Sequence, residues 1–180
     1  MNFKKSIAVC VLLSTFMMLF TGCGKEDTSR ESVQSTQISD NTQSETVDSL
    51  EVKFGYEGES FTLHLEDNET AAEIARIVGR TEWNLPIYNY DNYENWEVMQ
   101  YYDIPSRYEI PSEPELISTQ SAGEVYYSDP NRIILFYKDA QVEGEYTKIG
   151  YFDYSDDFLQ AVENNPVLEG WGNKIISISR

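Results

Sequence analysis

The chain has few side chains that could do chemistry, and they lie in separate stretches. Its one histidine is His64, and its two cysteines are Cys10 and Cys23. Most catalytic triads and metal centres need histidine beside a second base or donor, so we do not expect those classes of site. Both cysteines lie early in the chain, which leaves the rest without a thiolate or a disulfide. We predict no catalytic residue, no metal and no cofactor.

Three side chains late in the sequence match the start of a calcium loop. Asp153, Ser155 and Asp157 stand at its first, third and fifth positions. Such a loop also needs glycine at the sixth position and glutamate at the twelfth, where this chain has Phe158 and Asn164. The same residues suit the start of a helix, so we interpret them as a helix cap. Among the 31 acids, spacing marks no catalytic carboxylate pair.

Aromatic and amide side chains gather in one loop-like stretch, which is the best candidate for ligand recognition. Aromatic rings beside amides suit the faces of sugars and the backbones of peptides. The alternative is that this loop packs on the rim of the domain. The candidate ligand-binding residues are Tyr88, Tyr90, Asn92, Tyr93, Glu94 and Trp96.

A strand followed by a helix organises the part of the chain that must position these side chains. Apolar and polar residues alternate first, which predicts a strand over 60–65 with one buried face and His64 on the other. Apolar residues then recur at helical spacing, which predicts a helix over 69–78. Asp67 or Asn68 is expected to cap its start, and Gly79 to end it in the left-handed conformation. We interpret the nearby arginines, Arg76 and Arg80, as helix surface and terminus charges.

The remaining elements predict a mainly β fold. Alternating or continuous apolar runs predict strands at 50–54, 83–87, 123–127, 132–137, 146–152 and 174–179. A second short helix follows Ser155, and residues 89–107 are the least regular stretch. We expect 132–137 and 146–152 to form a hairpin. Short connections favour an antiparallel sheet of about eight strands closed into a β-barrel, with the two helices covering its ends.

The first residues read as an export signal. A basic start and a short apolar run lead to Thr-Gly-Cys, which resembles the lipobox of bacterial lipoproteins, although Phe20 stands where leucine is usual. We predict a signal peptide at 1–22, a disordered polar tether at 23–48 and one domain at 49–180. A lipidated Cys23 would anchor the protein, outside the cytoplasm, to the bacterial cell membrane.

The charge of the chain narrows the range of partners. The formal net charge is −18, which repels the phosphate backbones of nucleic acids and the headgroups of anionic lipids. Nucleic acid is therefore not an expected partner, and attachment to a membrane needs an anchor. We expect a monomer.

Four segments in order resemble the bacterial cyclophilin-like domain family, whose members are often small secreted or lipid-anchored proteins. The resemblance runs from about residue 51 to the end of the sequence, and it rests on residues 65–71, 123–125, 133–137 and 146–150. It implies a small closed β-barrel with helices at its ends. The biochemical role of the family is largely undefined.

True cyclophilins are prolyl isomerases, but their motifs do not carry over. This chain has neither the Phe-His-Arg run nor the later Gly-Gly-Asp. A shared fold does not by itself transfer an activity. We therefore expect a binding module for a peptide or a small molecule. The alternatives are a residual prolyl isomerase and an assembly partner of other envelope proteins.

Overall fold

The computed structural model describes residues 47–88, 93–170 and 172–180. The described residues belong to one compact unit, Gln43–Arg180. The predicted signal peptide, most of the predicted tether and the predicted anchor Cys23 lie outside the described residues.

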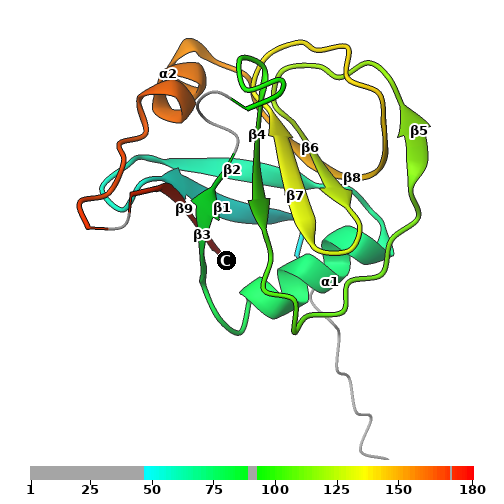
Figure 1. Ribbon diagram of the computed structural model, residues 1–180. Coiled ribbons are helices and arrows are strands. Elements are labelled where there is room, and N and C mark those ends of the chain that lie inside the picture. Colours follow the sequence, from blue (N-terminus) through cyan, green and yellow to red (C-terminus); the bar gives the residue numbers. More distant parts are fainter. Residues whose placement is uncertain (1–46, 89–92, 171) are drawn as a thin grey trace, which may run out of the picture. The chain divides into compact units, whose positions relative to one another are not determined.

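Nine antiparallel strands form the sheet of the described residues (Figure 1). In chain order they are β1 (Ser49–Phe54), β2 (Ser60–Leu65), β3 (Trp83–Ile87), β4 (Met99–Asp103), β5 (Glu115–Ile117), β6 (Glu124–Ser128), β7 (Arg132–Phe136), β8 (Gly144–Phe152) and β9 (Lys174–Ser179). Along the sheet the order is β3-β9-β1-β2-β8-β6-β7-β4, and β5 pairs with β8 beside this path. The mainly β prediction is confirmed.

The sheet curls but is not closed, so the prediction of a closed barrel is wrong. Strands β3 and β4 are its two ends, and no ladder joins them within the described residues. One backbone hydrogen bond crosses between these ends, from the Tyr88 N–H to the Tyr101 carbonyl at 2.8 Å. Pro86 lies in β3 and has no N–H to donate, which suits a strand at the end of a sheet.

Two further expectations about the strands are wrong. The hairpin predicted between 132–137 and 146–152 does not form, because β7 pairs with β6 and β4 instead. The tight turn after β6 joins it directly to β7, with Val125 opposite Leu135. Strand β4 lies in the stretch predicted to be least regular. Its buried residues are Met99, Gln100 and Tyr102, so a polar residue lies on the buried face and the alternation of apolar and polar residues that marks a half-buried strand is missing there.

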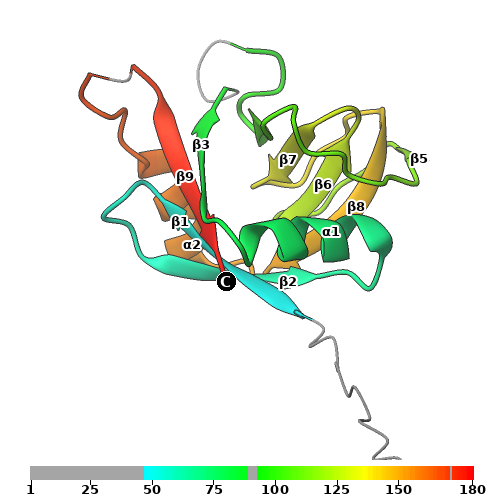
Figure 2. The ribbon, with the colours of Figure 1, turned by 90° about the horizontal axis from the view of Figure 1, so that it is seen from below.

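The helix α1 (Glu69–Val78) lies across one mouth of the curled sheet (Figure 2). Asn68 caps its start by accepting a hydrogen bond from the Ala71 N–H at 2.9 Å, as predicted. The prediction for Gly79 is wrong, because this residue ends the helix in the right-handed region at φ −62° and ψ −14°. Its N–H makes the ordinary helical bond to the Ala75 carbonyl, and the turn tightens one residue later, where the Arg80 N–H donates to the Ile77 carbonyl at 3.0 Å.

The second helix, α2 (Asp156–Asn164), begins after Ser155, whose hydroxyl accepts from the Phe158 N–H at 3.0 Å. Neither α1 nor α2, the helices of the described residues, is long and apolar enough to cross a membrane. Both contribute buried side chains to one core between them and the inner face of the sheet. Phe158 of α2 stacks there on Phe152 of β8, with ring centroids 5.0 Å apart.

Candidate functional site

Two strands leave the same edge of β8 at different points, and a crevice lies between them. Strand β2 pairs with β8 as far as Gly150, whereas β5 pairs with it only from Tyr146 backwards. Between them, Thr147 and Lys148 line a hollow of about 400 Å³. Where the two strands diverge, the backbone groups on this edge of β8 have no strand to pair with, although β6 still pairs with the other edge. We call this hollow the β8 crevice.

Side chains and loops bind the backbone and hydroxyl groups that the divergence exposes. Asn68 donates its amide to the Lys148 carbonyl at 2.8 Å, and the Thr147 hydroxyl accepts from the Glu113 N–H at 3.0 Å. The hydroxyl of Thr70, which is 2% exposed, donates to the Pro111 carbonyl at 2.7 Å. These bonds fix the start of α1 and the 111–113 segment as the two walls of the crevice.

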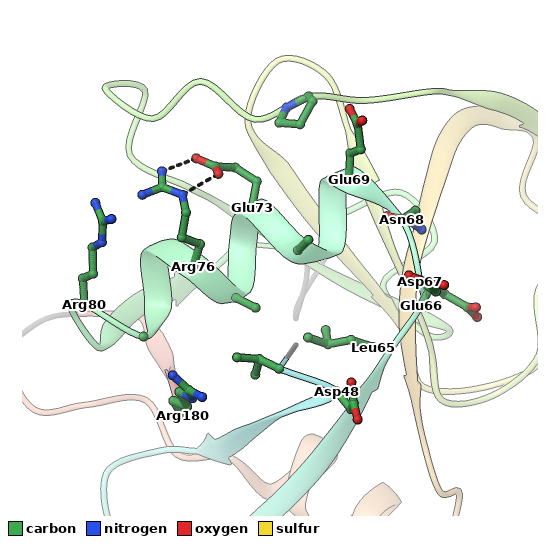
Figure 3. A pocket seen from close by; sticks show the side chains of 15 residues that line it. Asp48, Leu65, Glu66, Asp67, Asn68, Glu69, Glu73, Arg76, Arg80 and Arg180 are labelled. Atoms are coloured by element: carbon green, nitrogen blue, oxygen red, sulfur yellow. Dashed lines mark hydrogen bonds and ion pairs between the residues drawn. The ribbon is translucent and has the colours of Figure 1, made fainter. Parts of the chain in front are cut away.

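A second hollow, of about 910 Å³, runs along the side of α1 and shares Glu66, Asn68, Glu69 and Pro111 with the β8 crevice (Figure 3). Its helical wall carries Glu69, Ala72, Glu73, Arg76 and Arg80, which helical spacing places on one exposed face. Apolar contacts come from Val47, Leu65 and Ala75, and Arg180 lies opposite the end of the helix. We call this space the α1 hollow.

The charged centre of the β8 crevice is Lys148. Its ammonium lies 2.8 Å from a Glu124 carboxylate oxygen and 3.6 Å from one of Glu66. Burial lowers the pKa of Lys148, but the two carboxylates outweigh this and raise it. The amine therefore stays protonated at neutral pH, so it can donate hydrogen bonds to a ligand but is not a nucleophile.

Glu124 is held as a carboxylate by three donors. Lys148 and the Tyr126 hydroxyl both donate to it at 2.8 Å, and so does the Ser121 N–H. Burial raises the pKa of Glu124, but these hydrogen bonds favour the charged form more and the pKa is lowered. Glu124 and Lys148 are thus held as a pair of opposite charges.

On the helical wall of the α1 hollow, Arg76 is already engaged. It donates to both carboxylate oxygens of Glu73, one turn earlier, through Nε at 2.6 Å and through Nη2. The hydrogen bond from Arg76 lowers the pKa of Glu73, so the pair remains ionised and its charges cancel locally. The interpretation of Arg76 as a helix surface charge fits this pair.

The structure does not gather the predicted aromatic loop around either hollow. Tyr90 and Asn92 lie outside the described residues. Tyr88 is half-buried and stacks on Tyr101 with centroids 6.0 Å apart, while Tyr93 is 54% exposed. The remaining two candidates, Glu94 and Trp96, are exposed, and neither lines either of the two hollows.

Tyr137, which follows β7, holds the end of the aromatic loop through two hydrogen bonds. The Tyr137 hydroxyl donates to the Trp96 carbonyl, and the Tyr137 N–H donates to the Val98 carbonyl at 3.0 Å. Burial, with the nearby carboxylates of Glu163 and Glu97, raises the pKa of Tyr137 to about 12, so this donor keeps its proton. These contacts hold Trp96 and Val98 to the rest of the domain, and the role of the loop in ligand recognition stays a prediction.

His64 and the calcium-like segment 153–157, the other candidates from the sequence, make contacts that suit a structural role. His64 faces away from the core and its ring stacks on Tyr151, while its Nε2 atom lies 3.2 Å from Oδ2 of Asp153. Ser155 caps α2, which supports the helix-cap interpretation of the calcium-like segment. No group of three or more metal-binding side chains occurs in the described part of the chain.

Sequence reasoning missed the residues that line the two hollows. Glu69, Glu73, Arg76 and Arg80 follow one another at three- and four-residue spacing, so their common face could have been read from the sequence. Lys148 gave no such signal, because its partners Glu66 and Glu124 are distant in the chain and meet only through strand pairing.

Comparison with known proteins supports the fold. A family model described as "Cyclophilin-like family" matches residues 54–168. No curated protein matches the chain. Among solved structures, that of McbB in complex with tryptophan has 16% identity and a TM-score of 0.53, covering 73% of this chain and 44% of McbB. The chain thus spans less than half of McbB.

A second solved structure has a weaker similarity. The solution structure of the hypothetical protein AF2241 from Archaeoglobus fulgidus has 15% identity and a TM-score of 0.47, covering 75% of this chain and 95% of that protein.

Proposed function

This chain belongs to the cyclophilin-like family, and we propose that it is a binding protein for a short peptide or a small molecule. The observation that carries the proposal is the junction of the α1 hollow with the β8 crevice. Their volumes, about 910 and 400 Å³, are of the size that small-molecule and peptide sites occupy. The proposed site is therefore the wall of α1 and the floor of β8.

The groups in the two hollows suit binding better than catalysis. Lys148 is held protonated between two carboxylates, and Glu73 is held ionised by Arg76. These groups supply fixed charges and hydrogen bonds, which orient a ligand. General acid–base catalysis would instead need a group whose pKa lies near the working pH.

We propose only an auxiliary binding role for the aromatic loop. Tyr93 and Trp96 expose ring surface that could contact the far part of a longer peptide. Binding through the loop alone would leave both hollows unused. The test below separates these two cases.

Binding can be measured with pools of pentapeptides built from apolar residues, with free termini, by isothermal titration of the domain 47–180. L-Tryptophan, the ligand present in the McbB structure, serves as a separate small-molecule probe. Ala72 is exposed on the helical wall, so Ala72→Trp would fill part of the α1 hollow. Gln160→Trp, at an exposed position of α2, is the matched control.

We expect the parent domain and Gln160→Trp to bind a probe alike, and Ala72→Trp to weaken binding at least tenfold. Equal binding by all three proteins would place the site elsewhere and overturn the proposal. Absence of binding of every probe by the parent domain would also count against it.

We further propose that the protein is held at the outer face of the bacterial cell membrane through a lipid on Cys23. The Thr-Gly-Cys ending of the apolar start supports this, together with a net charge of −18 that gives no attraction to anionic lipids. The polar residues that follow would act as a tether for the binding domain.

A further inference from the structure

We infer that the β8 crevice binds the uncharged main-chain carbonyl groups of a peptide, through hydrogen bonds from Lys148 and Thr147. This inference rests on the proposed function and names the chemistry that one part of the same site recognises. It predicts a ligand whose peptide bonds, and not its charged ends, lie over β8.

Lys148 has a hydrogen-bond donor that its two carboxylates do not use. An ammonium group carries three N–H donors. One donates to Glu124 at 2.8 Å, and a carboxylate oxygen of Glu66 lies 3.6 Å from the nitrogen. With one donor assigned to each carboxylate a third remains, since no other side chain or backbone carbonyl of the described residues accepts from this ammonium. Lys148 lines the crevice, so this donor is within reach of a ligand there.

The hydroxyl of Thr147 also has an unused donor. Thr147 is 7% exposed and lines the crevice. Its oxygen accepts from the Glu113 N–H at 3.0 Å, but no acceptor in the described part of the chain takes the hydroxyl proton. A buried donor without a partner is unfavourable. A ligand acceptor in the crevice would therefore satisfy a group that the fold leaves unpaired.

The charges of the crevice favour an uncharged acceptor over a carboxylate. Among the described residues that line it, Lys148 is the single cation, and two carboxylates already neutralise it. The carboxylates of the lining are those of Glu66, Glu69, Glu113 and Glu115. Like charges repel over the short distances within a crevice, so a carboxylate of a ligand is disfavoured there. A peptide carbonyl accepts the same hydrogen bonds and brings no charge.

The shape and the apolar lining of the crevice suit a peptide. Thr147 and Lys148 are consecutive residues of β8. An extended peptide presents a carbonyl about every 3.3 Å, so it can offer one to each of these two donors. Pro111, Ile117 and Tyr146 line the same space of about 400 Å³ and supply apolar surface for the side chains of the peptide.

The test compares two sets of apolar pentapeptides with acetyl and carboxamide ends, so that neither set carries a charge. The first set has ordinary amides, and the second carries a thioamide, whose sulfur is a weak acceptor, at each peptide bond in turn. Both are titrated into the domain 47–180 and its Thr147→Ser, Thr147→Val, Lys148→Met and Lys53→Met variants. Lys53 is exposed and lines neither hollow, so it controls for the loss of one positive charge.

We expect the parent, Thr147→Ser and Lys53→Met to bind the amide peptides about tenfold more tightly than the peptides whose thioamide replaces the bound carbonyl. Thr147→Val and Lys148→Met each lack one donor. They should bind the amide peptides about tenfold less tightly than the parent does and should reduce the difference between amide and thioamide. A purely structural effect of either substitution would instead weaken the binding of both sets equally, which would count against the inference.

Equal binding of amide and thioamide peptides by the parent domain would overturn the inference while the proposed binding function stands. Binding of only the pentapeptides with free termini would overturn it in the same way, because charged ends would then be what the site recognises. If no peptide and no L-tryptophan binds the parent, the proposed function fails and this inference with it.

Discussion

The carboxylate of Glu124 joins β6 to β8 by accepting hydrogen bonds from Lys148, Tyr126 and Ser121. Because its pKa is lowered in the folded state, this group stabilises the fold above its unfolded pKa. The stabilisation is lost as the pH falls through the folded pKa. Replacement by glutamine should cost about 2 kcal/mol at pH 7, since it leaves charged and polar donors poorly matched.

Urea unfolding of the parent and Glu124→Gln at pH 7 and pH 3 checks this prediction. The difference between them should shrink at pH 3, where the parent carboxyl begins to take up its proton. Glu145→Gln, at an exposed position of the neighbouring strand β8, should change the stability by less than about 0.5 kcal/mol. A difference between the parent and Glu124→Gln that grew towards pH 3 would contradict this assignment.

Asn68 has two separate tasks, as the cap of α1 and as a donor to the Lys148 carbonyl. Asn68→Ala should remove both and destabilise the domain by about 2 kcal/mol, roughly 1 for each hydrogen bond. Asn68→Ser should keep the cap but cannot reach Lys148, and should cost about half as much. Thermal melting of the three proteins measures the order, and equal losses for alanine and serine would show that the cap is unimportant.

At the level of elements, the β8 crevice exists because β2 ends its pairing with β8 at Gly150. A methyl group on this glycine would lie 2.2 Å from the His64 carbonyl oxygen. Gly150→Ala should therefore push β2 away from β8 and destabilise the fold by about 3 kcal/mol. A melting temperature unchanged by this substitution would mean that the two strands are less closely packed than the structure has them.

The sequence predicted most elements, since their signals are local. The change from alternation to helical spacing located β2 and α1, and Asn68 and Ser155 were identified as caps by residue type. Strand β4 was missed because its buried face carries the polar Gln100, which breaks the alternation. Gly79 was misjudged because glycine only permits the left-handed conformation without requiring it.

At the level of the whole molecule, strand pairing is what the sequence could not supply. Leu135 of β7 faces Val125 of β6, and not a residue of β8 as a hairpin of 132–137 with 146–152 would need. The cluster of Lys148, Glu66 and Glu124 follows from the same pairing, so the site could not be assembled beforehand. The family resemblance was confirmed over residues 54–168, although the closed barrel expected from it was not.

The proposed anchor makes a prediction about the complete protein. Cys23→Ala should move the protein from the membrane fraction to the soluble fraction, because the net charge of −18 gives it no other attraction to anionic lipid. Fractionation of cells followed by immunoblotting measures this. Cys10→Ala, within the predicted signal, is the matched control and should leave the distribution unchanged. Retention of the Cys23→Ala protein on membranes would refute lipidation at that residue.

Backbone NMR of the domain 47–180, titrated with the pools of apolar pentapeptides, tests whether the ligand binds along α1 and over β8. We predict that the changes in amide chemical shift gather on the exposed face of α1, at 111–117 and at Thr147 and Lys148. Shifts confined to residues 93–98 of the aromatic loop, or an unchanged spectrum at saturating peptide, would contradict it.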